Sequence, residues 1–398
     1  MVIPFSPPDV TEAEIAEVVD TLRSGWITTG PKTKRFEKEI AAYCGTPKAV
    51  CLNSATAGLE LVLRLLGVGP GDEVITSAYT YTASASVIDH VGAKIVLVDV
   101  QKDAAEMDYD ALEKAITERT KVIIPVDIAG VCCDYETIYE IVERKKGLFH
   151  PANEIQKKFD RVIVLADAAH SFGATYKGKK SGDIADFSSF SFHAVKNLTT
   201  AEGGAVTWKK RADLDDEEIY RDLTLLSLHG QSKDALAKTK LGAWEYDIVT
   251  LGYKCNMTDI MASVGLAQLS RYGSLLQRRE EKFTRYYEAL SPLGARFLEQ
   301  QNAGSKGSFH LCIVRLPDRT EADRNAFIVR MAEKGVATNV HYKPLPMHTA
   351  YKEKGFSVED YPNAYDFYRN EVTLPLHTLL TDEQVEYVIT SFKECYER

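Results

Sequence analysis

Short apolar runs alternate with helix-spaced segments between residues 49 and 208 of the chain. The runs are rich in Val, Ile and Leu, and the segments between them repeat apolar side chains every three or four positions. This alternation is typical of crossover units, in which helices connect the strands of a mostly parallel sheet. We therefore predict a large α/β domain. Its strands are expected at residues 49–53, 73–77, 93–100, 121–126, 161–167, 187–192 and 205–208.

The last third of the chain has a different pattern. From residue 258 to residue 290, apolar positions continue at helical spacing for longer than in a typical helix, which predicts an element linking two lobes. Beyond this element we expect a smaller α+β lobe. Its strands are predicted at 309–316 and 336–342, and its helices at 321–334 and 381–397. The predicted domains are thus residues 1–255, with an N-terminal arm, and residues 256–398.

The segment 134–160 interrupts the alternation between two predicted strands. It is long for a single helix, and it carries Pro151 in a polar middle. We interpret it as a helix with an inserted surface loop.

Composition and charge exclude several classes of protein. A formal net charge of −9 disfavours a nucleic-acid-binding surface, which needs a basic stripe. The seven cysteines are odd in number and form no C-x-x-C pair, so we expect neither a disulfide framework nor a metal site. No apolar stretch reaches the roughly 18 residues of a membrane span. We therefore expect a cytoplasmic protein that meets its substrates in solution.

Lys196 is the first candidate for chemistry. A lysine is usually a solvated surface charge, and that reading stays open for this one. However, Lys196 lies among small and apolar residues, between a predicted strand and the pair Gly203-Gly204. A nucleophilic lysine must lose its proton near neutral pH, and partial burial in such a setting favours that loss.

Asp167 ends the very apolar run 161–167. Open α/β sheets bind ligands at the carboxyl ends of their parallel strands, so this carboxylate is expected at a ligand site. An acid there can keep a pyridine nitrogen protonated. The alternative is an aspartate that caps a following helix, and the motif alone favours neither interpretation.

Two further segments add possible cofactor contacts. Residues 53–58 (NSATAG) lie between a predicted strand and a predicted helix, where backbone N–H groups can bind a phosphate. An ordinary capped turn would have the same sequence. Tyr81 follows another strand and can stack on a planar ring, although a tyrosine there is more often part of the core.

Together these segments resemble the DegT/DnrJ/EryC1/StrS family of sugar aminotransferases, within the fold type I enzymes that use pyridoxal 5′-phosphate (PLP). The resemblance is nearly full length. It is carried by SGWITTGPK, NSATAGLEL, GPGDEVITSAYTY, DAAHSFGATYKGKKSGD, SFHAVKNLTTAEGG, LGYKCNMTDI and VHYKPL. The implied fold is that of PLP-dependent transferases, with a large α/β domain and a smaller C-terminal α+β domain.

The resemblance implies roles for matching residues around the cofactor ring. Lys196 would be the catalytic residue that forms the Schiff base with PLP and shuttles the substrate proton. Asp167 would pair with the pyridine nitrogen, and His170 would lie near the ring hydroxyl. Tyr81 would take the stacking position.

Other matching residues would hold the cofactor phosphate. Ala55, Thr56 and Ser191 would do so within one chain. Asn256 matches an asparagine that reaches the phosphate from the neighbouring subunit, which implies a homodimer with shared active sites. The alternative for Asn256 is a turn residue before the next helix.

Substrate contacts are less strongly marked. The candidates are Trp26 and Thr28 in the N-terminal loop, His229, and His341 with Tyr342 in the small lobe. A structural role is the alternative for each of the histidines.

The implied reaction moves an amino group from L-glutamate to a keto sugar linked to a nucleotide, with a UDP-linked 4-keto sugar expected first, for lipopolysaccharide or glycan biosynthesis. One rival is a sugar dehydratase of the same fold, in which histidine replaces the Schiff-base lysine; an aminohydroxybenzoate synthase is another. A third is a non-catalytic regulator, since fold alone does not establish activity. Lys196 and Asp167 are both present, which favours the aminotransferase.

Overall fold

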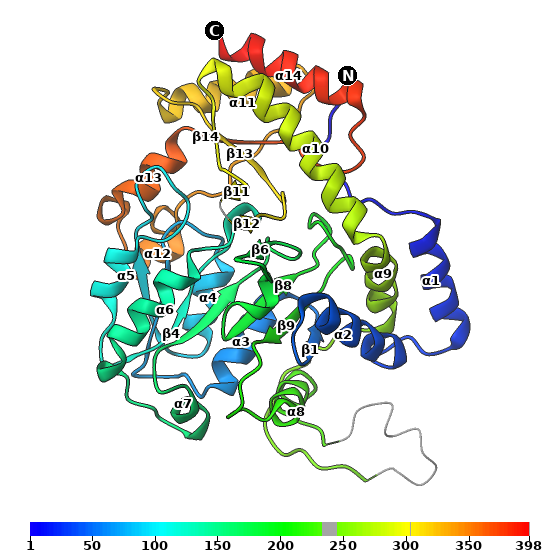
Figure 1. The fold of residues 1–398 in the computed structure, drawn as a ribbon, viewed down its shortest axis with the longest axis vertical. Coiled ribbons are helices and arrows are strands. Elements are labelled where there is room, and N and C mark those ends of the chain that lie inside the picture. The colour runs from blue at the N-terminus through cyan, green and yellow to red at the C-terminus, as the bar shows by residue number, and fades with distance from the viewer. Residues whose placement is uncertain (233–244, 303, 398) are drawn as a thin grey trace.

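A seven-stranded sheet forms the centre of the larger lobe, in the lower part of Figure 1. The computed structural model describes residues 1–232, 245–302 and 304–397. In order across the sheet, the strands are β1 (Ala49–Leu52), β9 (Gly204–Trp208), β8 (Phe187–Ser191), β5 (Ile163–Asp167), β4 (Thr120–Ile124), β2 (Glu73–Ser77) and β3 (Lys94–Val98). From β8 to β3 neighbouring strands are parallel, whereas β9 is antiparallel to both β8 and β1. The predicted α/β domain with a mostly parallel sheet is confirmed.

Helices cover both faces of this sheet because its strands are apolar on both sides. Along β5, Ile163 and Leu165 pack into one core, and Val164 and Ala166 pack into the other. The first core also includes residues of α3 (Ala55–Leu65), α4 (Ala83–His90) and α8 (Asp216–Ser227). The second includes residues of α2 (Pro31–Cys44), α5 (Tyr109–Ala115), α6 (Tyr135–Arg144) and α9 (Asp259–Ser270).

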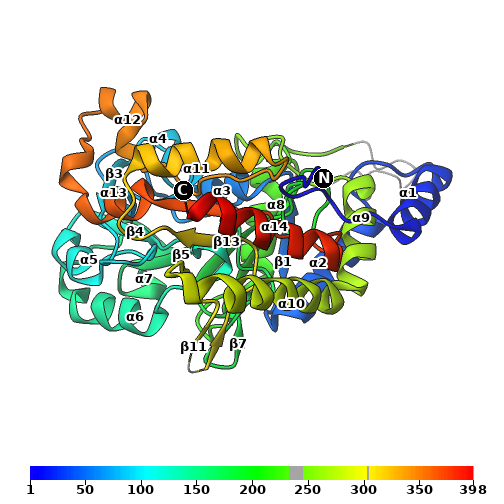
Figure 2. The same ribbon diagram turned by 90° about the horizontal axis from the view of Figure 1, so that it is seen from above.

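The smaller lobe is built on a three-stranded antiparallel sheet, in the upper part of Figure 1. Its strands are β10 (Arg296–Phe297), β13 (Cys312–Arg315) and β14 (Glu371–Leu374). The lobe's apolar core includes residues of α10 (Tyr272–Leu290), α11 (Glu321–Glu333) and α14 (Asp382–Tyr396). Figure 2 shows α11 and α14 over this lobe, with α1 (Glu12–Ser24) at one end of the molecule and α12 (Thr349–Glu353) and α13 (Pro362–Arg369) at the other.

A small four-stranded sheet joins the two lobes. It pairs the large-lobe hairpin β6 (Thr175–Tyr176) and β7 (Lys179–Lys180) with the small-lobe hairpin β11 (Gln301–Asn302) and β12 (Ser305–Lys306).

The strand predicted at 336–342 is wrong. Only isolated bridges occur there, from Val336 to Ile3 and from Asn339 to Thr373. The reason is local: the N–H of His341 donates to the side chain of Glu371 instead of a neighbouring strand (3.0 Å). The strand that completes the small sheet is β14, which the apolar pattern did not reveal.

The predicted linking element consists of two helices, α9 and α10, which meet at Arg271. This residue has a φ of −114°, outside the helical range. The segment 134–160 contains α6 and the short helix α7 (Glu154–Phe159). Most residues between these helices are exposed, as expected for a surface loop. The buried side chain of Gln156 on α7 donates to the carbonyl of Leu66, just after α3 (2.7 Å). Among the described residues, no helix is long and apolar enough to cross a bilayer.

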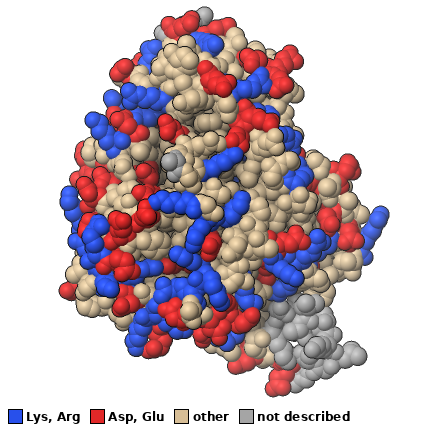
Figure 3. All heavy atoms as spheres, in the orientation of Figure 1, with Lys and Arg blue, Asp and Glu red and all other residues tan. Residues whose placement is uncertain are grey.

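On the face drawn in Figure 3, basic and acidic side chains are interspersed. Many charged side chains of the described residues form ion pairs at the surface, such as the pair between Arg144 and Glu113 (3.0 Å). Pairs of this kind contribute little stability individually.

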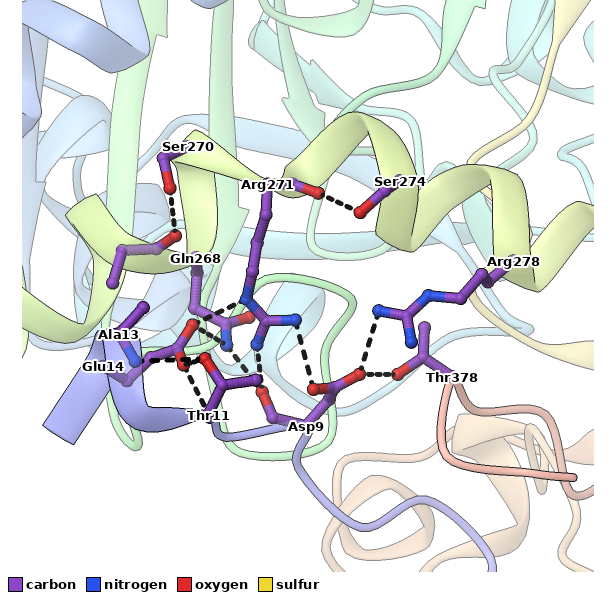
Figure 4. A network of polar contacts seen from close by, with 11 residues as sticks. Asp9, Thr11, Ala13, Glu14, Gln268, Ser270, Arg271, Ser274, Arg278 and Thr378 are labelled. Atoms are coloured by element: carbon purple, nitrogen blue, oxygen red, sulfur yellow. Dashed lines mark hydrogen bonds and ion pairs between the residues drawn. The ribbon is translucent and has the colours of Figure 1, made fainter.

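The N-terminal arm, residues 1–10, crosses from the small lobe to the start of α10. Figure 4 shows its anchor: Asp9 accepts hydrogen bonds from Arg271 (3.1 Å), Arg278 (3.4 Å) and Thr378 (2.5 Å). The Asp9 side chain is only 10% exposed. One carboxylate therefore holds together the arm, the linking helix and the small lobe.

A neighbouring carboxylate extends this anchor. Glu14 accepts hydrogen bonds from Arg271 (2.8 Å) and Gln268 (3.0 Å), and also caps the start of α1 through Thr11. Burial alone would raise the pKa of Glu14, but the hydrogen bonds from Thr11 and Arg271 outweigh this and lower it.

We expect Asp9→Asn to lower the free energy of unfolding by about 1–3 kcal/mol, because the substitution removes the charge that two arginines and a threonine bind. Chemical denaturation measures the change. Asp360→Asn is the control, since Asp360 is exposed and the substitution is chemically identical. Equal stability of the two variants would contradict an anchoring role for Asp9.

Candidate active site

A cavity of about 860 Å³ lies where the large-lobe strands end and the small-lobe segment 339–343 approaches. The sequence-predicted residues that line it are Ala55, Thr56, Tyr81, Asp167, His170, Ser191, Lys196, His341 and Tyr342. These residues come from loops far apart in the chain, and strand direction explains their meeting. The strands β5 and β8 are parallel neighbours, and the two antiparallel pairings through β9 return β1 to the direction of β8. The carboxyl ends of all three strands therefore meet at one edge of the sheet.

Lys196 lies in a turn that follows β8, where its N–H donates to the carbonyl of His193 (2.9 Å). Burial of its amine lowers the pKa of Lys196 to about 8, although the charge of Asp167 opposes the shift. A substantial fraction of the amine is therefore neutral near physiological pH. This is the state that a nucleophilic lysine needs.

Asp167 is the last residue of β5 and is 5% exposed. Its Oδ2 accepts a hydrogen bond from Ser84 (2.6 Å), and its Oδ1 accepts one from the N–H of Ala169 (3.2 Å). Burial raises the pKa of Asp167, and these hydrogen bonds and Lys196 counteract the shift. A turn follows instead of a helix, so Asp167 is not a helix cap.

The turn between β1 and α3 has the form of an anion site. Ser54 caps α3 by accepting from the N–H of Ala57 (3.1 Å), so the capped-turn interpretation is also correct. The N–H groups of Ala55 and Thr56 have no acceptor within the described residues and belong to the first turn of the helix. A side chain at Gly204 would lie 2.5 Å from the backbone nitrogen of Ala55, so only glycine leaves this turn undisturbed.

His170 is held in one tautomer. Its Nδ1 accepts a hydrogen bond from the N–H of Ala129 (3.2 Å). Burial, together with Lys196 and His341, lowers the pKa of His170 well below its usual value, so the ring is neutral and its hydrogen lies on Nε2. The Nε2–H then donates to the hydroxyl of Tyr342 (3.1 Å), which leaves the hydroxyl hydrogen of Tyr342 available to the cavity.

Tyr81 is 59% exposed at the mouth of the cavity, and its ring centroid lies 5.8 Å from that of Tyr342. The core tyrosine of this segment is Tyr79, which is fully buried. The exposed ring of Tyr81 is thus the one available for stacking on a ligand.

Four predicted residues do not line this cavity. Trp26 donates through its Nε1 to the Thr29 carbonyl (3.2 Å), and the carbonyl of Thr28 accepts from the N–H of Asp259 (3.1 Å). His229 is exposed. Asn256 hydrogen bonds with Thr29 and Lys254. Within one chain these residues lie outside the cavity.

Two residues of the site were missed by the sequence analysis. Ser84, on α4, binds Asp167 as described above, and nothing in its sequence context marks it. Asp127 lines the cavity and accepts hydrogen bonds from Ser171 (2.7 Å) and Tyr135 (2.9 Å). It follows β4 much as Asp167 ends β5, so its position just beyond a strand end was a usable signal.

The residues around the cavity fit PLP. The cavity combines a partly neutral lysine, a buried carboxyl group, a helix N-terminus with open N–H groups and an exposed aromatic ring. A PLP enzyme needs these groups to hold its cofactor. In described residues, no cluster of His, Cys, Asp and Glu has the arrangement of a metal site.

Comparisons with known proteins agree with this geometry. Residues 8–393 match the model of the DegT/DnrJ/EryC1/StrS aminotransferase family, whose members depend on PLP. The structure of Spr1654 from Streptococcus pneumoniae, a proposed sugar aminotransferase, in its PMP form is 60% identical, covers 99% of each chain and has a TM-score of 0.97. A PLP form of the same protein has also been solved.

Two relatives have more specific names. The spore coat polysaccharide biosynthesis protein SpsC of Bacillus subtilis is 37% identical over 98% of this chain and 96% of its own. The UDP-4-amino-4-deoxy-L-arabinose–oxoglutarate aminotransferase of Shewanella sediminis is 36% identical over 98% of this chain and 97% of its own. The protein is therefore a PLP-dependent aminotransferase of the DegT/DnrJ/EryC1/StrS family.

Proposed function

We propose that the enzyme transfers an amino group from L-glutamate to the carbonyl carbon of a nucleotide-linked keto sugar, with a UDP-linked 4-keto sugar as the first candidate. The product would serve lipopolysaccharide or glycan biosynthesis in the cytoplasm. The observation that carries the proposal is the convergence of Lys196 and Asp167 on one cavity. The names of two relatives support the sugar and the donor, since one names a polysaccharide and the other a UDP sugar and oxoglutarate.

Bound PLP supplies an electron sink that stabilises negative charge on the substrate carbon from which a proton is removed. The chain supplies the groups that hold this sink and move the proton. Lys196 provides a neutral amine that attaches the cofactor and then carries the proton at its Nζ. Asp167 would accept the hydrogen of the pyridine nitrogen, and Ser84 and Ala169 hold its carboxyl group in place.

The remaining contacts orient the cofactor and the substrate. The N–H groups of Ala55 and Thr56 at the start of α3 would bind the phosphate, and Ser191 would add a hydroxyl. Tyr81 would stack on the ring, and His170 would hold the side of the ring that bears the hydroxyl group. His341 and Tyr342 face the substrate from the small lobe, where the hydroxyl hydrogen of Tyr342 is available to an acceptor.

We propose that the active enzyme is a homodimer. Asn256, Trp26, Thr28 and His229 lie outside the cavity of their own chain. Large apolar side chains near these residues in the sequence are exposed: Ile15, Leu22, Ile27, Ile248, Val249 and Leu251, the last 93% exposed. A second copy of the chain would cover such side chains, and Asn256 would then reach the phosphate in the partner's site.

Mixing the protein with PLP should produce a visible absorption band, because the Lys196 amine attaches the cofactor. Added L-glutamate should bleach the band, because transfer of its amino group would leave the cofactor as an amine, which does not absorb in the visible, and would release 2-oxoglutarate. Lys196→Ala should lose both the band and the bleaching. Lys102→Ala, which alters an exposed lysine, should keep both. Mass spectrometry with UDP-linked 4-keto sugars then identifies the acceptor. Absence of the band would contradict the aminotransferase, whereas bleaching without sugar amination would contradict only the acceptor.

The rate at which the protein binds PLP should rise with pH and level off above pH 8. The neutral amine is the reactive form, and burial lowers the pKa of Lys196 to about 8. Below that pH the rate should fall about tenfold per pH unit. Stopped-flow absorbance measures it. A rate that keeps rising to pH 10 would indicate an ordinary, solvated lysine.

Asn256→Ala should weaken PLP binding about tenfold, as expected for the loss of one hydrogen bond to a charged group. If active sites are shared, subunit exchange between Lys196→Ala and Asn256→Ala proteins should restore about a quarter of the wild-type activity, because half of the dimers are hybrids with one intact site. The assay uses a PLP concentration at which the Asn256→Ala protein alone is nearly inactive. The control mixture of Lys196→Ala and Asp167→Ala should restore none. Failure of the first mixture would place Asn256 outside the partner's site.

A further inference from the structure

A carboxyl group is buried behind His341. Glu371 and Thr373 lie two residues apart on β14, so their side chains share one face of the strand, and both are fully buried. Glu371 Oε2 accepts the N–H of His341 (3.0 Å), and the hydroxyl of Thr373 donates to Glu371 Oε1 (2.6 Å). The Thr373 hydroxyl also lies 2.9 Å from His341 Nδ1. Glu371 thus holds the backbone of His341 directly and its ring through Thr373.

Two further contacts hold His341. The hydroxyl of Tyr79 donates to the His341 carbonyl (2.6 Å). The ring of Phe5, from the N-terminal arm, stacks on the imidazole at 5.6 Å between centroids and 20° between planes. His341 lines the active-site cavity, and its Nε2 has no hydrogen-bond partner in the described parts of the chain. A ring held so firmly offers Nε2 to a ligand.

The direction of the hydrogen bonds depends on the proton of Glu371. An ionised Glu371 only accepts, so Thr373 gives it the hydroxyl hydrogen and must accept from His341 Nδ1–H. The Nε2 of His341 is then a bare acceptor. A protonated Glu371 can donate to Thr373, which then donates to Nδ1, and the hydrogen of the imidazole moves to Nε2. The two states of Glu371 therefore correspond to two tautomers of His341.

We propose that Glu371 is a positioning residue that acts through Thr373 to set whether His341 offers a hydrogen-bond acceptor or a donor to the active-site cavity. The consequence for the sugar substrate rests on the function proposed above. In the donor state His341 suits a carbonyl or phosphate oxygen of the substrate. In the acceptor state it suits a sugar hydroxyl.

The surrounding groups allow the switch to occur near neutral pH. Burial raises the pKa of Glu371 to about 8, although Thr373, the N–H of His341 and the charge of Arg324 counteract the shift. Arg324 on α11 donates to the Glu371 carbonyl (2.9 Å). Arg315, opposite Glu371 on β13, is paired with Asp366 (2.8 Å) and also with Asp103.

The other titratable groups near Glu371 keep one charge state. Burial, followed by the charge of Lys196, lowers the pKa of His341 to about 3, so its ring is neutral. Burial raises the pKa of Tyr79 and Tyr342 far enough to keep both phenols neutral. Among the described groups near Glu371, Lys196 is the exception, because its pKa is also about 8.

The nitrogen resonances of ¹⁵N-histidine-labelled protein without substrate test this proposal. In the wild type, His341 should carry its hydrogen on Nε2 at pH 6.5 and on Nδ1 above pH 9, with a midpoint near pH 8. Glu371→Gln should abolish the change, because an amide does not titrate. Glu333→Gln, an exposed change of the same kind on α11, should preserve it. His341→Asn assigns the resonances.

If Glu371→Gln does not fold, a second pair of variants tests whether Thr373 connects Glu371 to His341. Thr373→Val, which removes the bridging hydroxyl, should abolish the tautomer change, and Thr373→Ser should restore it. A single tautomer at all pH values in the wild type, or a change that persists in Glu371→Gln or Thr373→Val, would refute the proposal. These outcomes need no sugar, so they are independent of the function proposed above. Once the acceptor sugar is identified, its KM should vary about tenfold with pH. Glu371→Gln should remove this variation of KM, but it should leave the pH dependence of kcat that the titration of Lys196 causes.

Discussion

The burial of an amine and a carboxyl group at the same edge of a sheet is the constraint on which this active site depends. Asp167 ends β5 and Lys196 follows β8, and these strands are parallel neighbours. Burial raises the pKa of Asp167 and lowers that of Lys196, and each charge counteracts the shift of the other. The reactivity of the lysine is thus a property of the sheet's topology as much as of the lysine itself.

The turn between β1 and α3, which we propose binds the phosphate, depends on the same topology. The strand β9 enters the sheet antiparallel between β8 and β1, which brings the start of α3 to the edge where Lys196 lies. Gly204, the first residue of β9, pairs with both Leu52 and Ser191 and leaves room for the backbone of Ala55. A side chain at this glycine would disturb the turn and the sheet edge together.

The sequence predicted what is periodic or lies at a strand end. The seven large-lobe strands follow from apolar runs, and Asp167 and Lys196 stand out because of their positions after such runs. The other features depend on contacts between residues that are distant in the chain, and no local sequence pattern reveals these contacts. The segment 336–342 is apolar enough for a strand, yet the side chain of Glu371 takes the His341 N–H that a neighbouring strand would bind. Ser84 reaches Asp167 from a helix that is distant in sequence, and no local pattern marks it.

The residues proposed to contact the cofactor and those proposed to contact the substrate form two halves of the site. Different parts of the fold hold each half in place. The proposed cofactor contacts lie on strand ends and a helix N-terminus, which pack on the core of the large lobe. His341 lies on an irregular segment and is held by Phe5, Tyr79 and Glu371, which belong to three distant parts of the chain. Changes in those supports would reshape the substrate half without moving the cofactor half. Two relatives align with this chain over nearly its whole length, although one is named for a spore coat polysaccharide and the other for a UDP sugar. A substrate half that varies independently of the cofactor half is consistent with such relatives.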